Sequence, residues 1–226
     1  MTVKPNLNKN DILAAYQYRH ACKEFDPNNK ISKEDFNFIL ETGRLSPSSF
    51  GFEPWKFIVV QNKEIREKIK TVSWGAQKQL PTASHFVIIL SRTKEHLNYD
   101  SEYVQSFMKN VQNLPDDVIA TKSKFYEDFI KHDFKLEESN RLFFEWGARQ
   151  TYIALGNMMT AASMIGIDSC PIEGFKKEAV EDILKKEKLI PQTGFGISCM
   201  VAFGYRIQDP RPKTRQTLDA IVEWVE

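Results

Sequence analysis

The sequence predicts an α+β fold, and three features of the 226-residue chain support this prediction. Residues 56–61 and 86–91 are short apolar runs rich in β-branched side chains, as expected of buried strands. The segments beside them carry apolar residues at helical spacing. Residues 136–165 form one long helical segment, and its second half is apolar on most faces. A chain of this length can bury a sizeable core, and we expect a single domain spanning residues 1–226.

The first third of the chain predicts two helices. Residues 11–18 have near-helical apolar spacing after Asn8 or Asn10 as a possible N-cap, and this helix should end near Arg19. Ser32 and Asp35 resemble a capping box that opens a second helix. The apolar face of that helix would contain Phe36, Ile39, Leu40 and Gly43.

The loop of residues 46–54 leads directly into the first predicted strand. Pro47 and Pro54 restrict the backbone, whereas Gly51 permits φ values closed to other residues. Ser48 and Ser49 offer hydroxyl and backbone N–H groups that suit an anionic or oxygen-rich ligand. On spacing alone, an ordinary helix-to-strand connection is the favoured explanation of the loop, because turn residues cluster in every loop.

The middle of the chain is the least informative part. Residues 63–72 predict a charged helix and residues 73–82 a polar loop, and two helical segments within 94–135 are separated at Pro115. Aromatic residues in this segment either line a substrate opening or anchor a cap. Their helical spacing favours burial. They are Tyr103, Phe107, Phe125, Tyr126, Phe129 and Phe134.

The long helix predicts a buried environment on all sides, because it is apolar almost all round. Either the helix is central in its own domain or a second subunit covers it, which gives modest support for a homodimer. Gly166 is its expected C-cap residue, and strands at 167–172 and 195–205 with a short helix at 176–186 follow. The apolar tail is expected to pack against a partner subunit. It contains Leu218, Ile221, Val222, Trp224 and Val225.

Composition excludes several classes of function. Lys plus Arg number 31 against 30 Asp plus Glu, so no net charge favours nucleic acid or a membrane surface. The apolar runs are too short to span a bilayer, and the start of the chain lacks the apolar core of a signal peptide, so we expect a cytoplasmic protein.

Metal and dinucleotide motifs are also missing from the sequence. The three cysteines are widely spaced, as in a protein with reduced thiols, and Cys22 is interpreted as a bystander. The four histidines show no metal-ligand spacing with one another or with cysteine. Gly194 and Gly196 lack the third glycine of a classical dinucleotide fingerprint.

Four motifs stand in order along the chain. They begin at Arg19, Ser46, Pro171 and Lys213 and read Arg-His-Ala-Cys-Lys, Ser-Pro-Ser-Ser, Pro-Ile-Glu-Gly and Lys-Thr-Arg. Together they resemble the FMN-dependent nitroreductase family, most closely the oxygen-insensitive NAD(P)H nitroreductases of bacteria. The resemblance extends over residues 11–215, including Trp146 ahead of the long helix and Ala83-Ser84-His85 at the start of a strand. It implies a mostly antiparallel sheet flanked by helices, and an intertwined homodimer that exchanges its C-terminal tails. It also implies that residues 94–135 form a helical insertion covering the flavin.

The resemblance implies where FMN would lie. The phosphate would meet Arg19, Lys213 and Arg215, Lys23 would approach N1 and O2 of the ring, and Glu173 would contribute its backbone near N5. The serine loop would come from the other subunit. The implied cofactor-binding residues are Arg19, His20, Ala21, Lys23, Pro47, Ser48, Ser49, Gly51, Gln77, Gln79, Pro171, Ile172, Glu173, Gly174, Lys213 and Arg215.

Some of these residues depart from the pattern of the family. Ala21 replaces a frequent serine, and Gly51 and Glu53 stand where asparagine and glutamine are frequent. Gln77 or Gln79 would replace a charged contact to the pyrimidine edge. These differences bear on the flavin potential and on substrate preference.

The function implied is ping-pong hydride transfer, in which NAD(P)H reduces FMN at N5 and a nitroaromatic, a quinone or a related electrophile then reoxidises it. The sequence contains no dedicated general acid or nucleophile, as expected where the cofactor performs the difficult step. Three alternatives stay open: a non-catalytic flavin-binding or regulatory protein, a reductase of one specific metabolite, and an α+β interaction protein without a cofactor. Nothing in the sequence distinguishes NADH from NADPH.

Overall fold

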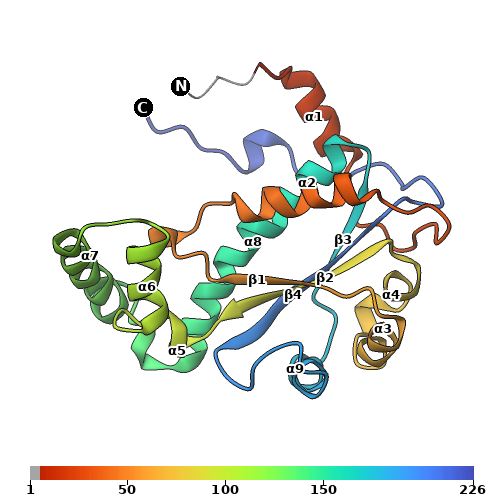
Figure 1. Ribbon diagram of the computed structural model, residues 1–226. Helices are drawn as coiled ribbons and strands as arrows, with labels where there is room; N and C mark the ends of the chain where they lie inside the picture. The colour runs from red at the N-terminus through yellow and green to blue at the C-terminus, as the bar shows by residue number, and fades with distance from the viewer. Residues whose placement is uncertain (1–5) are drawn as a thin grey trace.

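A four-stranded antiparallel sheet lies at the centre of the computed structural model, which describes residues 6–226 (Figure 1). Its strand order is β1-β2-β4-β3, and every neighbouring pair is antiparallel. Helices flank this sheet, so the expected α+β architecture is confirmed. The strands are β1 (Trp55–Val59), β2 (His85–Arg92), β3 (Asp168–Ile172) and β4 (Phe195–Gly204).

Helices cover both faces of the sheet because alternate strand residues point to opposite sides. Val87 and Ile89 of β2 belong to a core that includes side chains of α2 (Lys33–Arg44) and α8 (Asn140–Met164). Ile88 and Leu90 face a second core, which includes residues of three other helices. These are α3 (Lys63–Lys70), α4 (Gln79–Thr82) and α9 (Lys177–Lys186).

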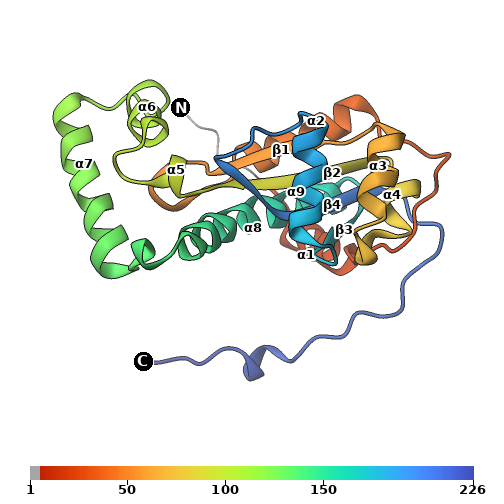
Figure 2. The ribbon, with the colours of Figure 1, turned by 90° about the horizontal axis from the view of Figure 1, so that it is seen from below.

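A helical arm extends from one end of the sheet (Figures 1 and 2). Its aromatic core includes Phe107 and Tyr126, which are buried, whereas Phe125 and Phe134 are exposed. Most of the aromatic residues thus pack within the arm, as their helical spacing favours. The arm consists of α5 (Lys94–Leu97), α6 (Glu102–Asn110), α7 (Asp116–Asp128), a π-helical turn (Phe129–Asp133) and a 3-10 turn (Leu136–Glu138).

Helix starts follow the predicted caps closely. Asn8 caps α1 (Lys9–Tyr18) by accepting from the backbone N–H of Asn10, and Ser32 caps α2 by accepting from Asp35 N–H. Gly166 has a φ of 75° directly after α8, as expected of a residue that ends a helix in the left-handed region.

Three sequence predictions are corrected. The segment 73–82 is not a loop, because it contains a 3-10 turn (Trp74–Ala76) and the short helix α4. The long helix begins at Asn140, where Ser139 caps it, and a separate 3-10 turn precedes it. Trp146 therefore lies inside α8 rather than ahead of it. Its ring is buried against the arm, where its apolar surface is removed from water.

One face of α8 is left uncovered within the chain. Ile153 and Met164 are exposed on it, and a Cβ placed on Gly156 would meet no atom within 4 Å. The expected burial on all sides is thus not achieved by a single chain. The tail after β4 runs away from the sheet (Figure 2), and it exposes Leu218, Ile221, Trp224 and Val225.

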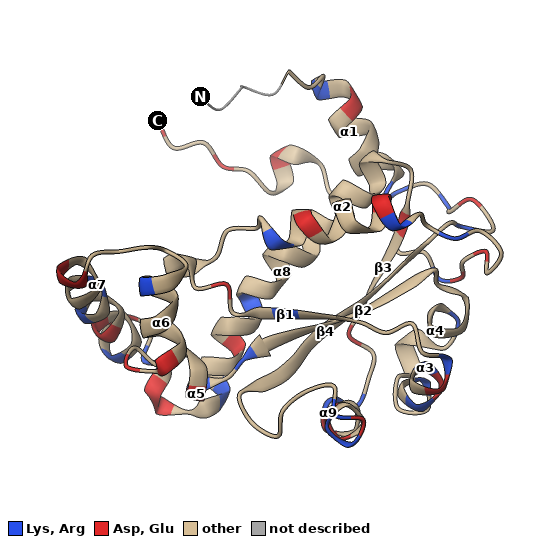
Figure 3. Ribbon diagram, in the orientation of Figure 1, with Lys and Arg blue, Asp and Glu red and all other residues tan. Residues whose placement is uncertain are grey.

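Positions of both charge signs are interspersed along α3, α7 and α9 (Figure 3). Such a mixed surface agrees with the near-neutral composition. Among residues 6–226, no helix has both the length and the apolar character needed to cross a bilayer.

Candidate functional site

The segment after α1 and the tail after β4 enclose a cavity of about 590 Å³, here called the cationic pocket. Two carboxylates line it, those of Glu24 and Asp209. Six cationic side chains line it as well, so a bound anion would be strongly favoured. They are Arg19, Lys23, Lys78, Arg211, Lys213 and Arg215.

Lys213 ties the tail to the end of α1. Its ammonium donates to the carbonyl of Tyr16 at 2.7 Å and also to the carbonyl of Arg19. Partial burial lowers the pKa of Lys213, and the nearby charges of Arg19 and Arg215 lower it further. Within residues 6–226 these three cations form no ion pair with a carboxylate. They therefore repel one another until an anion enters.

A buried ion pair between Asp168 and Arg206 lies close to the segments that form the cationic pocket. Asp168, at the start of β3, has a side chain only 1% exposed and accepts from Nη2 of Arg206 at 2.6 Å. The backbone N–H of Arg206 donates to the same carboxylate at 2.9 Å. The guanidinium also lies 4.0 Å from the ring centroid of Tyr18 and donates to its carbonyl. Arg206 thus joins α1, β3 and the start of the tail.

His20 and Ala21 lie beside this ion pair. Nδ1 of His20 is 3.5 Å from Asp168 Oδ1, and burial followed by the charge of Arg206 lowers the pKa of His20. Ala21 pairs with Ser169 as an isolated parallel bridge, and Cys22 N–H donates to the carbonyl of Ser169. The motif that begins at Arg19 is therefore fixed to the edge strand β3.

The turn that follows β3 lies next to the cationic pocket. Nζ of Lys23 is 3.9 Å from Sγ of Cys170, directly before the turn of residues 171–174. Gly75 N–H donates to the carbonyl of Gly174 at 2.7 Å, and a Cβ on Gly174 would lie 2.7 Å from the Cα of Gly75. This close approach requires glycine at both positions.

Glu173 in this turn is held by a neighbouring helix. The hydroxyl of Tyr152, on α8, donates to Oε1 of Glu173. Burial raises the pKa of Tyr152, and the bond to Glu173 raises it further. The Glu173 side chain is thereby directed toward α8.

The serine loop lies elsewhere in the same chain. None of Pro47, Ser48, Ser49 and Gly51 lines the cationic pocket. Ser49 N–H donates to Oε1 of Gln150, and the carbonyl of Gly51 accepts from Gln112 of the arm. In Figure 1 this loop lies at the arm end of α2, whereas the segment after α1 and the start of the tail after β4 lie beyond the other end of α2.

Two predicted glutamines point away from the pocket, and a lysine between them was missed. The amide of Gln77 donates to the carbonyls of Lys70 and Ser73, and Gln79 is buried with its amide 3.6 Å from Sγ of Cys170. Lys78 lines the pocket and pairs with Glu24 at 2.8 Å. A helical prediction for this segment would have indicated it, because consecutive helical residues point about 100° apart.

The thiols are not poised for reaction. Burial raises the pKa of Cys22 to about 11 and that of Cys199 to about 12, so neither forms a thiolate readily. In the part of the chain that the structure describes, no group of three or more His, Cys, Asp or Glu residues is arranged to hold a metal ion.

The fold and this site define a class of α+β protein with a cavity lined by cationic side chains at the edge of an antiparallel sheet. Residues 16–205 match the model of the nitroreductase family, and the chain belongs to that family. "Putative NAD(P)H nitroreductase YfkO" of Bacillus subtilis is 58% identical over 217 residues, covering 96% of this chain and 98% of its own. A similarly named Staphylococcus saprophyticus protein is 53% identical over 215 residues, covering 95% and 97% of the two chains.

Solved structures agree on the fold. A Staphylococcus epidermidis protein superposes with a TM-score of 0.78 at 24% identity, covering 99% of this chain and all of its own. An Exiguobacterium sibiricum protein crystallised in complex with FMN superposes with a TM-score of 0.74 at 18% identity over 99% of this chain and all of its own. At these identities the similarity establishes a shared architecture.

Proposed function

We propose that this protein is an FMN-dependent oxidoreductase that uses NAD(P)H to reduce nitroaromatics, quinones or related electrophiles. The observation that carries the proposal is the cluster of Arg19, Lys213 and Arg215, which lacks a carboxylate partner among the described residues. A phosphate dianion would neutralise this cluster, and the guanidinium groups suit its bidentate geometry. The names of the relatives and the FMN complex of a structural neighbour support the same proposal.

The residues next to this cluster fit the ring of FMN. When bound, FMN supplies the redox chemistry by accepting hydride from NAD(P)H at N5 and passing it to the second substrate in a ping-pong sequence. Lys23 would stabilise negative charge that develops at N1 and O2. Tyr152 holds the carboxylate of Glu173, which leaves the backbone of the turn to face the ring. Gly174 and Gly75 keep this edge free of side chains.

The proposal includes a homodimer with the FMN sites at its subunit interface. In a single chain, the exposed face of α8 and the apolar tail both present apolar side chains to water. A second copy would cover both. Such a partner would also bring its own Pro47, Ser48 and Ser49 to the flavin, which the loop does not reach within its own chain.

The test is the visible absorption spectrum of the purified protein, followed by anaerobic addition of NADPH and then NADH. A yellow protein bleached by either nucleotide, and recoloured by a quinone or a nitroaromatic, supports the proposal. A yellow protein that neither nucleotide bleaches indicates a flavin-binding or regulatory role. A colourless protein that cannot be reconstituted with FMN contradicts the proposal. Preference for a single natural electrophile over all generic ones would indicate a metabolite reductase.

A further inference from the structure

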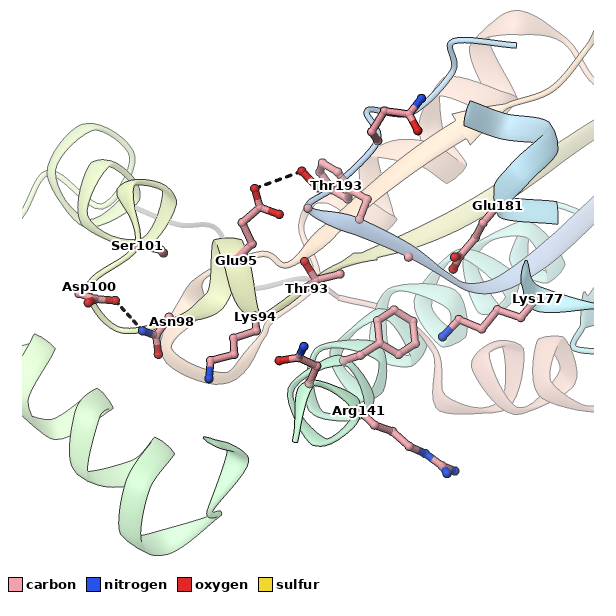
Figure 4. A pocket seen from close by; sticks show the side chains of 16 residues that line it. Thr93, Lys94, Glu95, Asn98, Asp100, Ser101, Arg141, Lys177, Glu181 and Thr193 are labelled. Carbon is pink, nitrogen blue, oxygen red and sulfur yellow. Dashed lines mark hydrogen bonds between the residues drawn. The ribbon is translucent and has the colours of Figure 1, made fainter. Parts of the chain in front are cut away.

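A second cavity, here called the α8–α9 pocket, lies between the start of α8, the start of α9 and the loop before β4 (Figure 4). Its volume is about 750 Å³, within the usual range for small-molecule sites. No residue of the cationic pocket lines it. It is therefore a separate site with room for a nucleotide fragment.

Lysines enter this pocket from two sides. In Figure 4, Lys94 and Lys177 extend into the space from α5 and α9, whereas the guanidinium of Arg141 points outward at the rim. Lys177 Nζ lies 3.3 Å from the ring centroid of Phe144, and Lys94 Nζ lies 5.5 Å from that of Phe143. Among the ion pairs of residues 6–226, neither lysine takes part.

Three carboxylates line the pocket, and each already has a neutral donor. Asp100 accepts from Nδ2 of Asn98 at 2.6 Å. Glu181 accepts from the backbone N–H of Ile197 at 2.9 Å, and Glu95 accepts from the hydroxyl of Thr193 at 3.1 Å. Both lysines thus remain available to an anionic ligand, and Phe144 offers an aromatic surface. A ligand with phosphate groups and an aromatic base matches these features.

Two elements, α8 and α9, extend from the α8–α9 pocket toward the turn at Glu173. Lys177 begins α9 only four residues after Glu173. Along α8, Arg141, Glu145 and Tyr152 lie on one face, and Tyr152 donates to Glu173. The eleven residues from Arg141 to Tyr152 span about 16 Å of helix. A dinucleotide can bridge this length in an extended conformation.

We propose that the α8–α9 pocket binds the adenosine half of the nicotinamide nucleotide and makes the enzyme prefer NADPH. The inference rests on the proposed function, because the nicotinamide ring must lie at the turn beside Glu173. Lys177, the nearer lysine, contacts the diphosphate that NADH and NADPH share. Lys94, at the far end, contacts the 2′-phosphate that only NADPH carries. The adenine ring packs against Phe144.

Two fragments test this assignment without turnover. ADP and 2′,5′-ADP are titrated calorimetrically into the FMN-loaded protein, its K94Q and K177Q variants and a K186Q control. Lys186, in the last turn of α9, is exposed and lies outside the pocket. Loss of one charge-assisted contact should weaken binding roughly tenfold. K94Q should weaken only 2′,5′-ADP, K177Q should weaken both fragments, and K186Q should weaken neither.

Anaerobic flavin reduction then measures the intact nucleotides. We expect the wild type to bind NADPH at least about tenfold more tightly than NADH. K94Q should remove most of this preference, whereas K186Q should leave it intact. A wild type that binds neither fragment, or a K94Q variant that affects NADH and NADPH equally, overturns the inference. A flavin that neither nucleotide reduces would instead overturn the proposed function, and the fragment titrations would then still decide for or against the pocket.

Discussion

Arg206 shows how a single residue organises the candidate site. It joins Asp168 of β3 to Tyr18 of α1, and the segment after α1 and the tail that begins at Arg206 both lead into residues that line the cationic pocket. Replacing Arg206 with Met should destabilise the fold by about 3–5 kcal/mol, because the carboxylate of Asp168 would be buried without a partner. Urea unfolding measures this change.

The matched control for R206M is R44M. Arg44 forms an ion pair with Glu41, but its side chain is 62% exposed and the pair is screened by water, so R44M should leave the free energy of unfolding nearly unchanged. Equal effects of the two substitutions would contradict the structural role given to Arg206.

His85 should make stability depend on pH. Its ring stacks on Phe36 at 3.8 Å, and burial, with the charges of Arg66 and Lys30, lowers its pKa from 6.5 to about 4. Between these values the unfolded chain binds a proton that the folded chain does not. Stability should therefore be constant above pH 6.5 and decrease as the pH falls toward 4.

Chemical denaturation at several pH values measures this slope. The substitution H85F should flatten it, whereas H132Q should leave it unchanged because the His132 side chain is 73% exposed. An unchanged slope in H85F would assign the acid sensitivity to other groups.

At the scale of elements, local chemistry decided which predictions were correct. The caps at Asn8 and Ser32 depend on hydrogen bonds within three residues, and the sequence displays both partners. Helix α4 was missed because it is only four residues long and contains Pro81, so it has no apolar period to detect. Gln79 is buried by contacts with Cys170, far along the chain, which local spacing cannot indicate.

Helix α8 carries a specific test of the proposed dimer. Because Gly156 has open space around it in the single chain, neither Ala nor Trp at this position should strain the subunit. G156A should stabilise the helix by about 0.5–1 kcal/mol. G156W should prevent a second subunit from approaching, and light scattering should then report the mass of a monomer.

Trp at an exposed position of α7 is the control for G156W. K124W adds the same bulk on the arm and should leave the mass unchanged. A dimer that persists in G156W would place the interface on another face of the molecule.

At the scale of the whole molecule, the two parts of the C-terminal tail have different tasks. Lys213 and Arg215 line the cationic pocket, and apart from Ile207 the exposed large apolar residues of the tail lie beyond them, from Leu218 onward. Sequence analysis paired the two cations with Arg19 through the family resemblance. The route of the tail away from the sheet depends on a surface that the single chain does not contain, so no local pattern could predict it.

Two truncations separate these tasks. Removing residues 217–226 keeps every cation of the pocket but deletes the apolar segment, so we expect a weakened dimer whose chains still bind FMN at high protein concentration. Removing residues 209–226 also deletes Arg211, Lys213 and Arg215, and FMN should then be lost at every concentration. Flavin absorbance and light scattering over a dilution series distinguish the two cases. If the longer truncation retained FMN, the phosphate would have to bind elsewhere, and the assignment of the cationic pocket would be wrong.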